Sequence, residues 1–181
     1  YFLFFLIIST LSIFYFKSHD DFPYYHLSFI SNLTASKLEF GIGIFDLALN
    51  HISSLFFFHS LLKLPFTQDY FYFLGPALIL IFFNTIIFKE IFNTNSKIIT
   101  FHNFLSVLIF AFINTFFYRL AEHGTDKSAI ILIFLCILLI FQILIQKKLD
   151  KNKLENFLIL ITFIVSLKSF YGIYGLLFFL I

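Results

Sequence analysis

The sequence predicts an all-α protein, a multi-pass transmembrane helical bundle. Hydrophobic residues make up 60% of the chain and charged residues only 12%, whereas about a quarter of the residues are charged in ordinary globular domains. The mean hydropathy is +0.97, and 32 residues are Phe. Residues 71–91, 98–118, 129–145 and 154–174 form apolar segments close to the roughly 20 residues that a helix needs to cross hydrocarbon. We therefore expect a single transmembrane domain over residues 1–181.

The charge pattern argues against nucleic-acid binding. The formal net charge is only +2, and the basic residues are scattered except within residues 147–153. A nucleic-acid-binding surface needs a basic patch or stripe. Membrane lipid is the expected surrounding of this chain, and no nucleic-acid partner is expected.

Residues 1–16 are apolar or carry hydroxyl groups, and they predict a first span. A signal peptide is the alternative, but no basic residues precede this segment and no small-residue cleavage site follows it. The chain contains no Met and both ends lie within apolar runs. These features predict a piece of a longer protein, truncated at both ends. The abundance of Phe, Ile, Lys and Asn favours a bacterial source.

Two segments of mixed polarity follow the first span. Residues 17–26 form a polar loop, and residues 27–40 have apolar side chains near helical spacing with polar ones between them. This pattern predicts an amphipathic helix at the bilayer surface. Residues 41–62 are apolar but interrupted by polar side chains, which are expensive in lipid unless they face a cavity. That segment is either re-entrant or spanning.

The four later spans are joined by short connectors at residues 92–97, 119–128 and 146–153. Polar residues occur inside the apolar segments at no metal-ligand spacing. We expect these residues, His59, Asn84, His102 and Asn114, to be hydrogen-bond partners between helices.

The distribution of Lys and Arg predicts the orientation. Residues 146–153 are the most basic connector, so the positive-inside rule places them in the cytoplasm. Residues 119–128 and the start of the 71–91 span then lie outside. If residues 41–62 do not cross, the loop at 17–26 is also outside, and Lys168, roughly 20 Å along its helix, reaches the outer leaflet. If they do cross, the two polar loops lie on opposite faces.

Adjacent carboxylates in the first loop, Asp20 and Asp21, carry the candidate chemistry. One of them can act as a general base toward an acceptor hydroxyl or amine. Together they can instead hold a divalent cation against a phosphate leaving group, with His26 as a further ligand. Arg119 and Lys168 can neutralise phosphate oxygens. The alternative is that the two carboxylates belong to a solvated loop without chemistry.

Three motifs follow one another in the chain. They are Asp-Asp-Phe-Pro-Tyr-Tyr-His at residues 20–26, Asn-His-x-Ser-Ser at 50–54 after a Gly-x-Gly, and Arg-Leu-Ala-Glu-His-Gly-Thr-Asp at 119–126. Their order resembles an uncharacterised bacterial multi-pass membrane family related to the C-type (GT-C) membrane glycosyltransferases. The resemblance covers roughly residues 14–126. It implies a fragment of a GT-C-like fold with an interfacial helix after the first span.

The resemblance also implies a function, the transfer of a sugar from a polyprenyl-phosphate donor at the outer face of the bacterial inner membrane. The catalytic carboxylate is then Asp20 or Asp21. The substrate-binding residues, with Lys168 added from the orientation argument, are Tyr25, His26, Arg119, Glu122 and Asp126. Two alternatives without this activity are a polysaccharide polymerase or ligase, which would depend on outer-loop arginines, and a transporter, which would place acidic groups and broken helices at the midplane.

Overall fold

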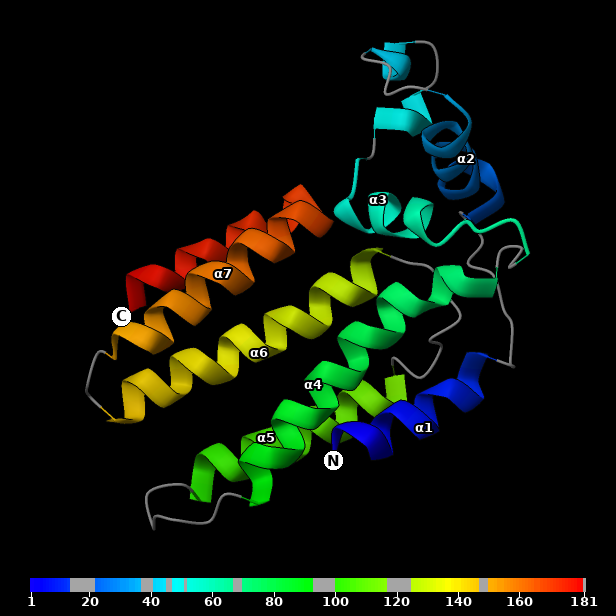
Figure 1. Ribbon diagram of the computed structural model, residues 1–181. Coiled ribbons are helices and arrows are strands. Elements are labelled where there is room, and N and C mark those ends of the chain that lie inside the picture. Colours follow the sequence, from blue (N-terminus) through cyan, green and yellow to red (C-terminus); the bar gives the residue numbers. More distant parts are fainter. Residues whose placement is uncertain are drawn as a thin grey trace.

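The computed structural model describes residues 1–13, 22–36, 41–44, 47–50, 52–66, 70–92, 100–116, 125–146 and 150–180. Regular structure in these ranges is entirely helical, with no strand among them, which confirms the all-α prediction. Five longer helices lie side by side, and shorter helices cover one end of them (Figure 1). The five are α1 (Phe2–Ile13), α4 (Leu74–Phe92), α5 (Thr100–Phe116), α6 (Thr125–Gln146) and α7 (Lys151–Leu167).

Each of these helices runs in the opposite direction to the one before it in the chain, so that their ends form two groups. α4 contacts α1, α5 and α6, and α6 in turn contacts α7. One end of the bundle, here called the α3 end, contains Ile13, Leu74, Phe116, Thr125 and Leu167 (Figure 1). The other, here called the Glu90 end, contains Phe92, Thr100, Gln146 and Lys151. This alternation is the one that the predicted topology requires when residues 41–62 do not cross.

The core lies mainly around α6, which is buried on several sides. Side chains from four helices meet there, and Phe83, Ile113, Cys136 and Ile164 are fully enclosed. A helix that is apolar all round can pack on several neighbours at once. The core is therefore continuous from α4 to α7.

Two amides pair inside the bundle. Asn84 Nδ2 donates to Asn114 Oδ1, and Asn114 Nδ2 donates to Asn84 Oδ1, both at 2.9 Å. Each amide thus satisfies the other across the α4–α5 contact. This finding confirms the predicted role of both residues as interhelical hydrogen-bond partners.

The outer surface of the bundle is strongly apolar. Side chains on four different helices are more than half exposed, among them Leu3, Ile7, Phe104, Leu108, Ile159 and Phe179. Soluble monomers rarely expose contiguous apolar patches of more than a few hundred Å². Two of the described helices, α4 and α6, are also long and apolar enough to cross a membrane.

The predicted helix over residues 154–174 is wrong beyond Leu167. α7 ends there because Lys168 adopts an extended backbone, with φ −155° and ψ 112°. A 3-10 helix, η6 (Ser169–Leu180), then returns along α7 (Figure 1). Gly172 suits this close return, because a Cβ atom there would lie only 3.3 Å from Val165 Cγ2, whereas a Cβ atom at Gly175 would be in ordinary contact with Ile161 Cγ2 at 3.7 Å.

The segment at residues 41–62 contains three short helices among its described residues. They are η2 (Ile42–Ile44), η3 (Leu47–Asn50) and α3 (Ser54–Leu61). The longest has 8 residues and rises about 12 Å, well short of a hydrocarbon core of about 30 Å. No described helix of this segment spans a membrane by itself, and whether the segment is re-entrant or spanning stays a prediction.

The shorter helices form a layer over the α3 end. It comprises η1 (Phe22–His26), α2 (Leu27–Ala35), α3 and η4 (Tyr70–Phe73). Phe22, Ile30, Phe56 and Tyr72 form a small core of their own within this layer. α2 confirms a helix within residues 27–40, and its position at a membrane surface stays a prediction.

Candidate functional site

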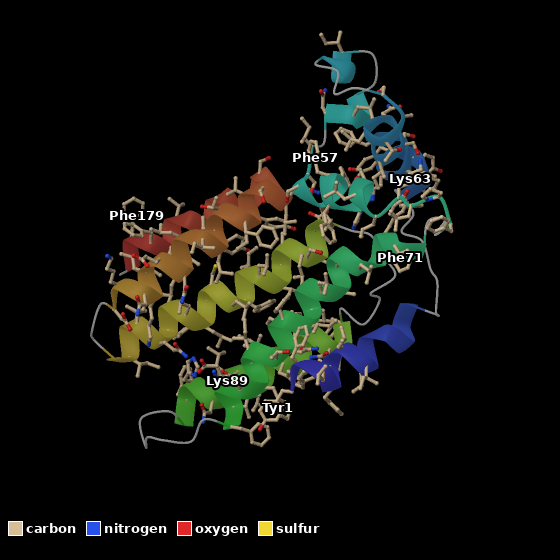
Figure 2. The ribbon with its side chains drawn as sticks, viewed as in Figure 1. Tyr1, Phe57, Lys63, Phe71, Lys89 and Phe179 are labelled. Carbon is tan, nitrogen blue, oxygen red and sulfur yellow. The ribbon has the colours of Figure 1, made fainter. Side chains whose placement is uncertain are left out.

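The predicted site residues that the structure describes are Tyr25, His26, Asp126 and Lys168. All four lie at the α3 end. Phe57 and Lys63 mark this end in Figure 2, far from Lys89 at the other. Asp20, Asp21, Arg119 and Glu122 lie outside the described residues.

Asp126 and Lys168 form an ion pair between two helices. Lys168 Nζ donates to Asp126 Oδ2 at 2.7 Å, and the two side chains are 34% and 48% exposed, respectively. Asp126 lies in the first turn of α6, where the helix dipole favours a negative charge. A pair this exposed contributes only about 0–1 kcal/mol to stability. It therefore positions the Lys168 ammonium more than it holds the fold together.

A cavity of about 250 Å³ opens beside this pair. Its apolar lining comes partly from Phe56, Leu167 and Phe170. Its polar lining residues are Tyr25, Asn50, Ser53, Thr125, Lys168 and Ser169. The cavity thus joins the first polar segment, the α3 region, the start of α6 and the end of α7.

Backbone geometry places the Asn50 side chain at the cavity. Asn50 Nδ2 donates to the Gly43 carbonyl oxygen at 3.3 Å. A Cβ atom at Gly43 would lie 1.7 Å from Asn50 Oδ1, so any larger residue there would displace the Asn50 side chain from this position. Gly41 has φ +85°, a left-handed conformation that also favours glycine. The Gly-x-Gly and the Asn-His-x-Ser-Ser motif therefore work as one structural unit.

Two serines of that motif fix α3 to the site. Ser53 Oγ accepts a hydrogen bond from the Leu55 backbone N–H at 3.3 Å and caps the first turn of α3. Ser54 Oγ lies 3.0 Å from Ser166 Oγ, which joins α3 to the last turn of α7. α7 in turn carries Lys168, so both walls of the cavity are tied together.

Tyr25 and His26 have different places in the site. Tyr25 lines the cavity, whereas His26 is only 2% exposed and lies behind it. The His26 ring centroid is 4.3 Å from that of Tyr25 and 4.8 Å from that of Phe56. His26 therefore supports the two aromatic walls. The described residues contain no group of three His, Cys, Asp or Glu side chains that could hold a metal ion.

A second buried histidine, His59, belongs to α3 within the same layer of short helices and is fully enclosed. Burial, followed by repulsion from His26, lowers the pKa of His59 to about 3. His59 is therefore neutral at physiological pH. The His59 ring centroid lies 5.8 Å from that of Tyr72, which is a packing contact. Its predicted role as an interhelical hydrogen-bond partner stays a prediction.

Sequence reasoning missed part of this site. Asn50, Ser53, Thr125 and Ser169 line the cavity but were not predicted to bind substrate. The first two belong to the Asn-His-x-Ser-Ser motif, which was the available signal. Ser169 follows a turn that the continuous apolar pattern of residues 154–174 concealed.

The chain matches no family model, no curated protein and no solved structure. The resemblance to C-type membrane glycosyltransferases therefore depends on the order of the three motifs. The geometry of the cavity is an observation that does not depend on this resemblance.

Proposed function

We propose that the chain belongs to a membrane glycosyltransferase that takes a sugar from a polyprenyl-phosphate donor, with the cavity at the α3 end as part of its substrate site. One observation carries the proposal. The cavity combines a positioned ammonium group, from Lys168, with hydroxyl and amide side chains and an aromatic wall. Such a site suits a ligand that has both a phosphate and a sugar.

Each part of the donor has a counterpart in the lining. The Lys168 ammonium faces the phosphate as a point charge, while Asp126 holds its side chain in place. The hydroxyl groups of Ser53, Thr125 and Ser169 can exchange hydrogen bonds with sugar hydroxyls. The exposed apolar surface of the bundle suits the polyprenyl chain.

The proposed reaction needs a base, and Asp20 or Asp21 supplies it. The oxygen of the acceptor hydroxyl forms a bond to C1 of the sugar, while the bond from C1 to the phosphate oxygen breaks. The acceptor proton passes to the carboxylate. Polyprenyl phosphate leaves as the anion, and Lys168 stabilises the charge that develops on it. Asp21 directly precedes Phe22, the first residue of η1, in the sequence.

The proposed location is the bacterial inner membrane, with the α3 end at its outer face. The apolar surface and the two long apolar helices, α4 and α6, support a membrane position. Lys151 and Lys153, at the start of α7, belong to the opposite end of the bundle, which suits the cytoplasmic side.

Release of polyprenyl phosphate tests this function without knowledge of the acceptor. Membranes that contain the full chain receive polyprenyl-phosphate-linked glucose, mannose or galactose, and the freed carrier phosphate is measured with and without EDTA. We expect release with at least one donor, loss of turnover in Asp20→Asn or Asp21→Asn, and a KM about tenfold higher in Lys168→Met. Loss of release with EDTA would assign a divalent cation to the step.

Lys151→Met is the matched control for Lys168→Met, because Lys151 lies at the Glu90 end, away from the proposed site, with its side chain 87% exposed. It removes the same charge but should leave KM unchanged. Release no faster than in membranes without the chain, or full activity in both Asp variants, would refute the proposed function.

A further inference from the structure

A larger cavity lies at the Glu90 end of the bundle, away from the proposed glycosyltransferase site. Its volume is about 520 Å³, within the range of roughly 300–1,000 Å³ that is usual for small-molecule sites. It is lined by side chains from α4, α5, α6 and α7. Lys89, labelled in Figure 2, is the chain neighbour of the lining residue Glu90 and marks this end of the molecule.

The lining changes from polar to apolar along three of the helices. On α4, Glu90 lies at the helix end and Ile87 one turn further in. On α6, Gln142 lies nearest the helix end, and Leu139 and Leu135 lie progressively deeper in the bundle. On α7, Lys153 and Asn156 lie nearer the helix start than Ile159 and Leu160 do. Seven residues of helix correspond to roughly 10 Å. The cavity therefore fits an amphiphile whose head lies at the helix ends and whose chain points into the bundle.

The polar part of this cavity has a group that lacks a partner. His102 is 5% exposed, and its Nε2 atom is buried without a hydrogen-bond partner among the residues that the structure describes. An unsatisfied buried nitrogen costs free energy, which a polar ligand group beside the ring would recover. Next to it, Glu90 Oε2 accepts a hydrogen bond from Gln142 Nε2 at 2.8 Å, which orients the carboxylate.

The cavity also contains charges of both signs. A simple anion would be repelled by Glu90, and a simple cation would be repelled by Lys153. A headgroup that carries an ammonium and a phosphate places a charge of opposite sign near each of these two residues. A primary ammonium can also donate hydrogen bonds to the Glu90 carboxylate, which a trimethylammonium group cannot do.

We propose that this cavity is a binding site for a phospholipid with a phosphoethanolamine headgroup. The ammonium group contacts Glu90, the phosphate accepts hydrogen bonds from Lys153 and His102, and one acyl chain lies among the apolar side chains further in. The lipid site does not depend on the glycosyltransferase proposal, because the two cavities share no lining residue.

Native mass spectrometry of the full chain in detergent tests this site. The protein is titrated with phosphatidylethanolamine, phosphatidylcholine and phosphatidylglycerol that carry the same acyl chains. We expect phosphatidylethanolamine to bind about tenfold more tightly than the other two lipids. Phosphatidylcholine carries both charges but cannot donate a hydrogen bond to Glu90, and phosphatidylglycerol has no ammonium group. Similar binding of all three lipids, or a preference for another of them, would overturn the proposal.

Two variants and a matched control locate the site. Glu90→Gln should reduce phosphatidylethanolamine binding to the phosphatidylcholine level, and Leu139→Trp, which fills the apolar part, should weaken binding of all three lipids. Glu155→Gln removes the same charge from an exposed carboxylate outside the cavity and should retain the preference. Equal effects of Glu90→Gln and Glu155→Gln would contradict the assignment. If Glu90→Gln does not fold, the wild-type lipid order and Leu139→Trp still decide.

Discussion

Acidification should destabilise the layer at the α3 end through His59. The folded state lowers the pKa of this histidine from 6.5 to about 3, first because the ring is buried and second because His26 is nearby. Between these two values the unfolded chain binds a proton that the folded chain does not. The contribution of neutral His59 is therefore fully present above pH 6.5 and is lost as the pH falls toward 3.

The size of the effect follows from the two pKa values. At pH 5 the difference in protonation of His59 lowers the free energy of unfolding by about 2 kcal/mol, and the full loss near pH 3 is about 5 kcal/mol. Between pH 8 and 5 the carboxylates stay mostly ionised, so histidines account for most proton uptake in this window. Tyr72 is in ring contact with His59, and His26 is near enough to repel its protonated form.

The assay is denaturant unfolding of the purified chain in detergent at pH 8, 7, 6 and 5, for the wild type and for His59→Gln. The wild type should lose about 2 kcal/mol over this range. His59→Gln should be less stable at pH 8 but lose much less between pH 8 and 5. An equal fall with pH in both proteins would refute the reasoning, because the proton uptake would then belong to other groups.

Two further substitutions test the packing. Gly75→Ala should cost about 1–3 kcal/mol in thermal or denaturant unfolding, because its Cβ would lie 2.7 Å from Leu55 Cδ1, whereas Gly175→Ala, with its nearest atom at 3.7 Å, should be neutral. Equal effects of the two would contradict the close contact between α3 and α4. Asn114→Leu should cost about 1 kcal/mol, because it leaves the buried Asn84 amide without its partner, and the Asn84→Leu/Asn114→Leu double variant should regain most of that loss. Additive losses in this double-mutant cycle would show that the amides do not interact.

The fold could be predicted from the sequence where hydropathy and length decide. The helices at residues 74–92, 100–116 and 125–146 follow the apolar segments closely, because continuous apolar runs of this length have few other solutions. The turn at Lys168 could not be predicted, because the run is apolar on both sides of it. The return of η6 depends on how Gly172 packs on α7, which is tertiary information.

The candidate site was predictable in part. The charge pattern and the orientation rule predicted Asp126 and Lys168 on the same face of the membrane. The structure joins the two side chains in an ion pair, and their role in substrate binding stays a prediction. Tyr25 and Lys168 line one cavity, which the sequence did not predict for this pair. The place of His26 behind the cavity could not be read from the sequence, because it depends on the packing of Phe56. The roles of Asp20, Asp21, Arg119 and Glu122 stay predictions.

We expect the α3 end to face outward and to bind the carrier phosphate. Thiol labelling of Ser169→Cys in a Cys136→Ala background tests it most directly, because residue 169 is exposed and lines the cavity. In intact cells, an impermeant reagent should label Ser169→Cys, and short-chain polyprenyl phosphate should slow the reaction. Lys151→Cys, at the Glu90 end, should react only after lysis. Labelling of Lys151→Cys but not Ser169→Cys in intact cells, or no protection by polyprenyl phosphate, would contradict the account.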